Sequence, residues 1–199
     1  NDTVGGVPVS VAYGPLCNSA TVFEREVAGR VLDFGVSGLH YNSSLVMYDR
    51  QTETLWSHFT GEPLYGALGE AELVSRPATI TGFGTWVAEH PDGLVLNRAT
   101  GVDRRYGVNP YPGYDQVDND PFLFEGEVDG RFTAMTRVVG VESDGAAVAF
   151  PLLELREEGV KTALTGPDTG DGRQIGRASC RDSVWGWGGG GGGVGGGGG

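Results

Sequence analysis

Basic residues are scarce in this chain, and lysine is almost absent. Its 14 basic residues, of which only Lys161 is a lysine, face 26 acidic ones, so the formal net charge is −12 at pH 7. No basic cluster is present that could follow a phosphate backbone, which argues against nucleic-acid binding. Anionic lipid would be repelled by so acidic a surface. Because no apolar run approaches the roughly 20 residues that span a bilayer, we also expect no transmembrane segment.

Cysteine is also scarce, and one of the two cysteines lies in a segment that we interpret as non-native. Ile175 to Arg181 matches the translation of a common short-read sequencing adapter, and the residues behind it are nearly all glycine. The alternative is a natural glycine-rich linker. We expect residues 175–199 to be a disordered, non-native tail, and Cys180 falls within it. Cys17 is then a free thiol, a ligand, or the partner of a cysteine ahead of Asn1.

The remaining sequence consists of short β-rich runs separated by Gly, Pro and Asx turns. This pattern predicts a β-rich fold, all-β or α+β, built from antiparallel hairpins with a few short helices. The turn signals that we interpret as hairpins are Ala28–Gly29, residues 49–53 and residues 143–145. Strands are expected at residues 7–13, 20–27, 30–36, 44–48, 54–59, 72–76, 93–97, 138–141 and 146–150. Helices are expected at residues 85–90, with Thr85 as N-cap, and at 152–158.

Length and composition indicate how the chain divides. About 160 residues suffice for one domain with a sizeable core, so we expect a single β-rich domain over residues 1–160. The chain opens at Asn1 without an initiator Met. Residues 161–174 are rich in Gly, Thr and Asp and indicate either a loop or the start of corrupted sequence.

Residues 101–121 are expected to form a long irregular loop, because glycines and prolines recur throughout them. A loop this long in a compact domain usually binds or covers something. Its tyrosines offer ring surface with polar tips, which suits a binding surface. An equal alternative is that these rings only pin the loop to the core. The candidate ligand-binding residues in this loop are Tyr106, Asn109, Tyr111, Tyr114 and Asp115.

Several segments, in order along residues 1–160, together resemble a prokaryotic family known as domain of unknown function 3179. They include Asn1 to Val9, Gly14 to Ala20, Phe34 to Gly38, Asn42 to Arg50, Leu55–Trp56, His90 to Asp92, Tyr106 to Tyr111, Gly113 to Asp115 and Pro121 to Phe124. The family resemblance implies that the domain of residues 1–160 is truncated at its N-terminus. Family members often carry export or lipoprotein signals, so the resemblance implies a location outside the cytoplasm. The family usually has Cys-Pro-Leu-Cys where this chain has Gly14-Pro15-Leu16-Cys17, which leaves one sulfur here.

Cys17 follows a predicted strand, on a turn with Asn18 and Ser19 as polar neighbours. A thiol in such a place can act as a nucleophile, because strand ends and turns hold a reactive atom within reach of substrate. The alternative is that Cys17 is a small buried hydrophobe, as most free cysteines are. We count Asn18 and Ser19 among the candidate ligand-binding residues.

A thiol nucleophile needs a base, and the chain has three histidines. His90 belongs to a family-like segment and is our candidate base, although a histidine at a helix end also serves as a cap. His40 and His58 are expected at the surface. For a metal, Cys17, Met47 and His90 form a soft donor set that suits copper or zinc, whereas Met47 also fits a core position.

These observations leave three hypotheses for the function. The first is an extracytoplasmic binding domain with a cysteine-centred site for a soft metal, a small ligand or a redox partner. The second is an enzyme with Cys17 as nucleophile and His90 as base. The third is an interaction or structural module in which Cys17 is buried and inert.

Overall fold

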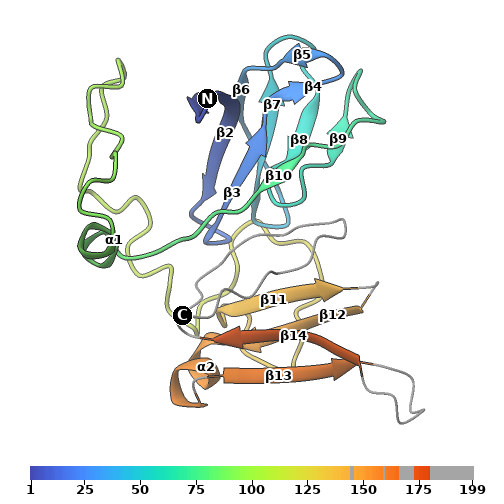
Figure 1. Cartoon of the computed structure of the whole chain (residues 1–199). Coiled ribbons are helices and arrows are strands. Elements are labelled where there is room, and N and C mark those ends of the chain that lie inside the picture. The colour runs from blue at the N-terminus through green and yellow to red at the C-terminus, as the bar shows by residue number, and fades with distance from the viewer. Residues whose placement is uncertain (144–145, 159, 166–172, 180–199) are drawn as a thin grey trace.

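Two four-stranded antiparallel sheets pack against each other in the N-terminal part of the chain (Figure 1). The computed structural model describes residues 1–143, 146–158, 160–165 and 173–179. The first sheet has the order β1-β2-β3-β10 and the second the order β6-β7-β8-β9. The strands of the first are β1 (Asp2–Val4), β2 (Val7–Gly14), β3 (Ser19–Glu24) and β10 (Ser75–Arg76). Those of the second are β6 (Phe34–Tyr41), β7 (Ser44–Asp49), β8 (Leu55–Ser57) and β9 (Pro63–Tyr65).

Short hairpins connect these strands, as the turn chemistry of the sequence predicts. The small hairpin of β4 (Glu26–Val27) and β5 (Arg30–Val31) comes between β3 and β6 in the chain and turns at Ala28 and Gly29. Both turn residues have positive φ, the conformation that two-residue hairpin loops require. The hairpin predicted around residues 49–53 is also present, as the β7–β8 pair. The β-rich, antiparallel prediction is therefore confirmed.

The two sheets share one hydrophobic core. Phe23 of β3 meets Phe34 of β6, Met47 of β7 and Trp56 of β8, and the rings of Phe34 and Trp56 pack edge to face. Along β3, buried and half-buried residues alternate, which is the period of a strand with one face toward a core. Met47 belongs to this core, so the structural interpretation of this residue is confirmed.

A buried carboxylate closes the β7–β8 hairpin. Asp49 is fully buried, and its Oδ2 accepts hydrogen bonds from the Trp56 indole at 3.0 Å and the Thr52 hydroxyl at 2.8 Å. Its Oδ1 accepts a third from the Thr52 amide at 2.6 Å. A buried carboxylate is tolerated only where such donors replace water. Asp49 thus fixes the orientation of the largest side chain in the core.

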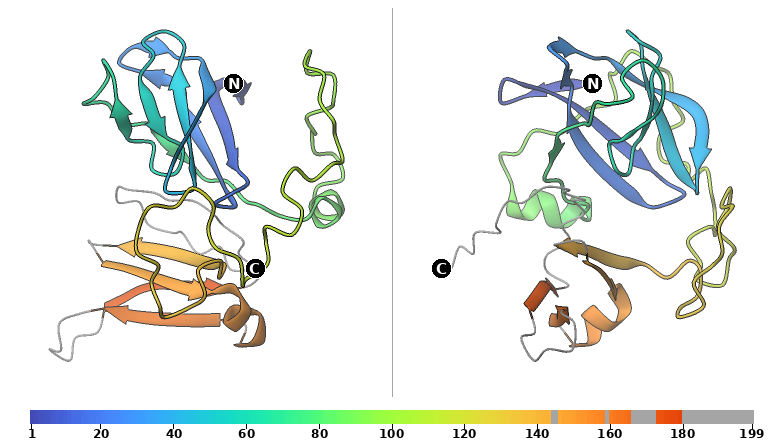
Figure 2. Two further views of the ribbon diagram at one scale, coloured as in Figure 1. Left: turned by 180° about the vertical axis from the view of Figure 1, so that it is seen from behind. Right: turned by 90° about the vertical axis from the view of Figure 1, so that its right-hand side faces the viewer.

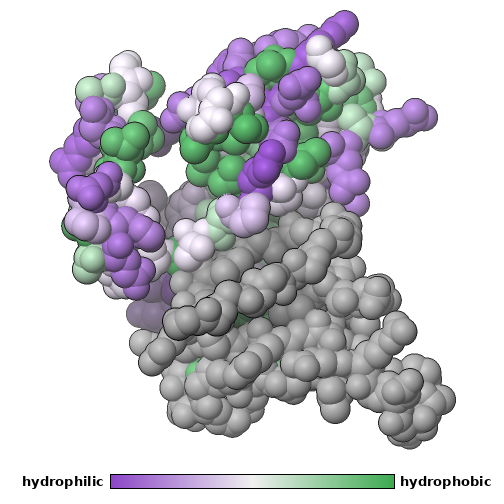
Figure 3. Space-filling view, in the orientation of Figure 1, coloured by the Kyte–Doolittle hydropathy of each residue, from purple (hydrophilic) through white to green (hydrophobic). Residues whose placement is uncertain are grey.

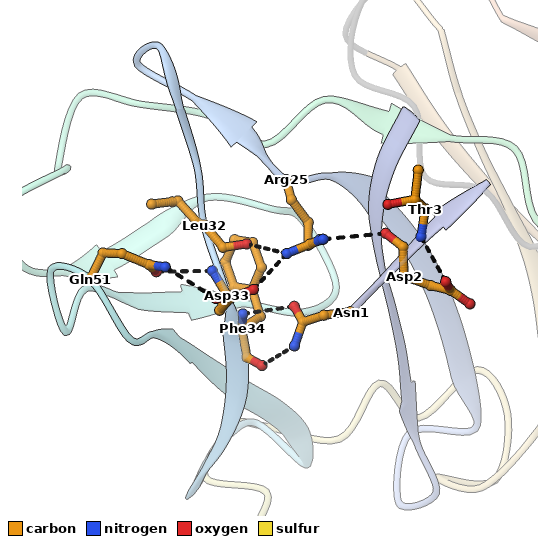
Figure 4. A network of polar contacts seen from close by, with 8 residues as sticks. All are labelled: Asn1, Asp2, Thr3, Arg25, Leu32, Asp33, Phe34 and Gln51. Atoms are coloured by element: carbon orange, nitrogen blue, oxygen red, sulfur yellow. Dashed lines mark hydrogen bonds and ion pairs between the residues drawn. The ribbon is translucent and has the colours of Figure 1, made fainter. Parts of the chain in front are cut away.

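Polar contacts also join the first strand of the chain to the second sheet (Figure 4). The Asn1 side-chain amide donates to Phe34 O and accepts from Phe34 N. It thus makes with β6 the two hydrogen bonds that the backbone of a neighbouring strand would make. Arg25, with 11% of its side chain exposed, donates to Leu32 O and Asp33 and more weakly to Asp2 O. These contacts lie at the end of β2 opposite its turn into β3.

A long irregular segment follows β10 and contains one helix, α1 (Phe83–Glu89). Figure 2 shows α1 and the chain after it extending beside the sheets rather than between them. The helix is capped by Gly82 instead of Thr85, which lies inside the helix, so the predicted N-cap is wrong. The strand predicted at residues 93–97 is also wrong, because these exposed residues have no neighbouring strand to pair with. The predicted irregular loop at residues 101–121 is confirmed.

The C-terminal part contains two further hairpins and a short helix. The strands β11 (Val138–Ser143) and β12 (Ala146–Pro151) pair, followed by α2 (Leu152–Glu158), β13 (Val160–Thr165) and β14 (Arg173–Ser179). Val139, Phe150 and Leu155 form a second, smaller hydrophobic cluster. The strands β13 and β14 correct the prediction that residues 161–174 and the start of the tail lack regular structure. Residues 180–199 of the predicted tail lie outside the described residues.

The surface of the sheets mixes polar and apolar side chains (Figure 3). Exposed apolar residues include Val11 of β2 and Val36 of β6. In the part of the chain that the structure describes, neither helix has the length or apolar character to cross a bilayer.

Removal of the Asp49 carboxylate should destabilise the protein markedly. We expect Asp49→Ala to lower the free energy of unfolding by about 3 kcal/mol, because the Trp56 indole loses its buried acceptor. Urea denaturation followed by tryptophan fluorescence measures this change. Asp92→Ala, in the exposed turn after α1, is the matched control and should leave the midpoint unchanged. Equal midpoints for the two variants would contradict the role given to Asp49.

Candidate active site

Cys17 lies in the four-residue turn between β2 and β3. Gly14 pairs with Ser19 across the hairpin, so residues 15–18 form the loop, and Asn18 has the positive φ that closes it. Leu16 is buried and anchors the turn, whereas Cys17 is only half-buried. The sulfur therefore lies at the edge of the protein, held by a rigid hairpin.

His58 directly follows β8 and is fully buried. Its backbone is tied to both sheets, because its amide donates to Leu45 O of β7 and its carbonyl accepts from the Thr21 hydroxyl of β3 at 2.7 Å. Its ring lies between the sheets as well. On one side Nδ1 is 2.8 Å from Ser44 Oγ and 3.2 Å from Leu45 O. On the other side Nε2 is 3.1 Å from Ser19 Oγ and 3.8 Å from Cys17 Sγ.

The contacts of Nδ1 determine which ring nitrogen of His58 carries the proton. A carbonyl oxygen such as Leu45 O can only accept a hydrogen bond, so it favours a proton on Nδ1. In the neutral ring, Nε2 then presents its lone pair to Ser19 and Cys17. This assignment follows from the hydrogen-bond network and makes Nε2 the basic atom of the site.

Cys17 and His58 therefore form a thiol–imidazole pair that the Ser19 hydroxyl bridges. Sγ lies 3.3 Å from Ser19 Oγ and 3.5 Å from Gly14 O. Burial raises the pKa of the Cys17 thiol, but hydrogen bonds with His58 and Ser19 and the charge of His58 lower it by more. The net result is a pKa below the ordinary value of a cysteine, as in reactive thiols.

A large open cleft lies in front of this pair, with a volume of about 1050 Å³. The β2–β3 turn contributes Cys17, Asn18 and Ser19 to its wall. The opposite wall comes from the irregular segment and from β11 and β12. It includes Asn109, Tyr111, Tyr114, Asp115, Phe124 and Phe132. A half-buried thiol with a lowered pKa thus lines a space that can hold a sizeable organic molecule.

The β6–β7 turn and the residue after it contact both the His58 ring and the irregular segment that forms a wall of the cleft. Asn42 and Ser43, both with positive φ, form a two-residue loop between the paired residues Tyr41 and Ser44. The Ser43 amide donates to Leu123 O at 2.9 Å, and its hydroxyl donates to Phe122 O at 2.7 Å. The next residue, Ser44, contacts His58 Nδ1. This turn therefore sets the position of the irregular segment relative to the imidazole.

Most of the site residues predicted from the sequence meet in this cleft. Cys17, Asn18, Ser19, Asn109, Tyr111, Tyr114 and Asp115 all line it. Tyr106 does not, since it stacks under the Arg98 guanidinium and contacts Thr100 elsewhere in the irregular segment. Met47 lies in the core of the sheets.

The histidines are distributed differently from the prediction. His90 is exposed at the C-terminal cap of α1, where its amide donates to Trp86 O and its ring packs on the Trp86 ring. This is the capping alternative, and His58 is the histidine beside Cys17. The prediction that His58 lies at the surface is wrong. One sequence signal indicates that His58 is buried. It lies two residues after Trp56, so the strand period places both side chains on the core face.

No group of three or more His, Cys, Asp or Glu side chains is arranged around a common metal position in the part of the chain that the structure describes. Of the soft donors predicted from the sequence, Met47 and His90 do not join Cys17. The donor pair that the structure does bring together is Cys17 with His58.

Comparison with protein families identifies the chain. Residues 1–172 match the family model described as protein of unknown function (DUF3179), so the chain belongs to this family. No curated protein and no solved structure matches the chain. The resemblance found in the sequence is confirmed, and the match ends just ahead of the segment interpreted as non-native.

Gly14 should prove essential to the thiol–imidazole pair. A Cβ atom at this position would lie 2.7 Å from Cys17 Sγ and 2.9 Å from His58 Cε1, closer than non-bonded atoms approach. The His58 ring cannot retreat easily, because Ser44 and Leu45 hold it from behind. We expect Gly14→Ala to separate the pair and to slow alkylation of Cys17 at pH 7 by about tenfold.

Mass spectrometry of the iodoacetamide-treated protein, resolved to the Cys17 peptide, measures this rate. Gly84→Ala is the matched control, because a Cβ there meets nothing within 4 Å. If Gly14→Ala reacted as fast as Gly84→Ala, the close approach at Gly14 would have no bearing on the thiol.

Proposed function

We propose that this protein is an enzyme that uses Cys17 as a nucleophile and His58 as its general base. The observation that carries the proposal is the fixed imidazole, whose Nε2 faces the Cys17 sulfur while Nδ1 is held by Leu45 O and Ser44. A nucleophile, a base within reach and a group that orients the base are the parts of covalent thiol catalysis. The low pKa of the thiol and its position on a cleft fit the same role.

The reaction class that suits this geometry is acyl transfer to water. His58 Nε2 takes the thiol proton, directly or through the Ser19 hydroxyl, and the thiolate attacks the carbonyl carbon of the substrate. The bond from that carbon to the leaving group breaks, and the imidazolium returns the proton to the leaving group. Water then attacks the thioester with His58 as base, which releases the acid and restores the thiol.

Two features favour acyl transfer by Cys17 over the other assignments of the site. Thiol–disulfide exchange needs a second thiol to resolve the mixed disulfide, and Cys17 is the single free cysteine among the described residues. Ser19 also contacts Nε2, but its side chain is buried with 4% exposed, whereas Cys17 is half-buried and more accessible. Ser19 is therefore assigned to proton transfer and Cys17 to attack.

A second candidate is binding of a soft metal, copper or zinc, by the same two residues. Sγ and Nε2 are 3.8 Å apart, close to the about 3.5 Å that separates a sulfur and a nitrogen on one tetrahedral zinc ion. Among the described residues, no third His, Cys, Asp or Glu side chain joins these two around a metal position. Elemental mass spectrometry of the wild type and of Cys17→Ser, after growth in metal-supplemented medium, separates the two proposals: one equivalent lost in the variant supports the metal.

Location outside the cytoplasm is part of this proposal and is supported by the family resemblance alone. A cysteine that works as a free thiolate in an oxidising compartment would need protection from disulfide formation. The half-buried position of Cys17, with Ser19 and His58 on its inner side, supplies some of that protection.

The pH dependence of Cys17 alkylation tests the proposed pair. In the wild type, the rate should rise through a pKa below that of glutathione, because the deprotonated thiolate is the reactive form and His58 stabilises it. His58→Gln removes the base and leaves only the Ser19 hydrogen bonds to oppose the effect of burial, so the pKa of the Cys17 thiol should rise and the rate at pH 7 should fall by at least about tenfold.

Because His58 is buried, its replacement can affect folding, and a second variant is needed. Ser44→Ala keeps the imidazole and removes one contact of Nδ1, so it should shift the same profile by a smaller amount. Circular dichroism checks that each variant is folded. A wild-type Cys17 that reacts only after unfolding, or a profile identical in all three proteins, would reject the nucleophile assignment.

A further inference from the structure

The cleft in front of Cys17 is rich in aromatic side chains. Tyr13, Phe59, Tyr111, Tyr114, Phe124 and Phe132 line it together with the thiol. Phe59 packs against the His58 ring, with centroids 6.4 Å apart and planes at 69°. It therefore brings an apolar surface next to the reacting atoms.

The two tyrosines of the irregular segment form a second apolar surface. The Tyr111 and Tyr114 rings lie 6.2 Å apart, and the Tyr114 hydroxyl accepts a hydrogen bond from the Phe122 amide at 3.0 Å. Phe122 is held in turn by the hydroxyl of Ser43. These contacts fix Tyr114 relative to the sheets, and Tyr111 beside it is 37% exposed. A ring that is fixed but still partly exposed can stack on a ligand at low entropic cost.

The charged groups of the cleft largely cancel one another. Arg131 pairs with Asp129 and, chiefly through that hydrogen bond, holds the pKa of the carboxyl at about 2, so both groups stay charged. Arg137 lies 3.9 Å from Asp115. Glu127 leaves the lining with a small negative excess, and the net charge of the chain is −12. An anionic ligand would meet repulsion, because both arginines among the described lining residues lie beside carboxylates.

We infer that the substrate presents an uncharged aromatic or apolar acyl group to Cys17. This inference rests on the proposed function for the attack by the thiol, but the selectivity of the cleft can be measured without knowing the natural substrate. The probes are iodoacetamide, its N-phenyl derivative and iodoacetate. They alkylate the same sulfur and differ in ring surface and charge.

The second-order rate of each probe at Cys17 is divided by its rate with glutathione at the same pH, which removes differences in intrinsic reactivity. We expect the ratio for the N-phenyl reagent to exceed that for iodoacetamide by about tenfold, the usual gain from one well-placed aromatic contact. The ratio for iodoacetate should be the lowest of the three because of charge repulsion.

Two tyrosines of the same segment provide the variant and its control. Tyr111→Ala removes a ring that lines the cleft and should reduce the preference for the N-phenyl reagent by at least threefold. Tyr106→Ala removes a ring that does not line the cleft and should leave the preference unchanged. Iodoacetamide itself should react with Tyr106→Ala at the wild-type rate.

The possible outcomes separate the inference from the proposed function. Equal ratios for the N-phenyl reagent and iodoacetamide, or a preference for iodoacetate, would overturn the inference while an activated thiol stands. A Cys17 with the pKa of glutathione that still prefers the N-phenyl reagent would support the inference and reject the nucleophile. If Tyr111→Ala and Tyr106→Ala both lost the preference for the N-phenyl reagent, the preference could not be assigned to the aromatic lining of the cleft.

Discussion

The burial of the His58 ring between the two sheets is the constraint on which the site depends. Thr21 and Ser19 of the first sheet contact its carbonyl and its Nε2, and Ser44 and Leu45 of the second contact its Nδ1. A buried imidazole without partners on both nitrogens would be costly. Because the first sheet contacts the ring at Nε2 and the second sheet contacts it at Nδ1, any movement that separates the sheets breaks these contacts. The geometry of the thiol–imidazole pair therefore depends directly on the packing of the two sheets.

The residues around His58 are small, and this follows from the same constraint. Farther along the strands the space between the sheets is filled by Phe23 and Trp56, but near the site the inward positions are Gly14, Ser19 and Thr21. A larger side chain at any of them would compete with the ring, most directly at Gly14, where even a Cβ clashes. At the end of the sheets near His58, polar contacts therefore take the place of hydrophobic packing. At the opposite end, the β7–β8 hairpin packs tightly through the contact between Asp49 and Trp56.

Sequence alone predicts the local features of this molecule much better than the meeting of its distant parts. The hairpins at Ala28–Gly29 and β7–β8 follow from turn residues and alternation, which are properties of neighbouring positions. Cys17 is identifiable because its turn and its polar neighbours are local too. His58 is 41 residues away from Cys17, and their contact exists only because two sheets face each other. No local pattern encodes that arrangement, and for this reason His90, in a family-like segment, was the more attractive base.

The composition of the irregular segment predicts that it is a loop, but it does not predict which of its side chains face the cleft. Its glycines, prolines and tyrosines predict a loop with a binding role, yet Tyr111 and Tyr114 face the cleft while Tyr106 does not. Ser43 of the Asn42–Ser43 turn binds the backbone at residues 122 and 123, and the Phe122 amide in turn donates to the Tyr114 hydroxyl. Its neighbour Ser44 orients His58. The contacts that fix the irregular segment and those that orient the imidazole therefore come from two neighbouring residues, Ser43 and Ser44.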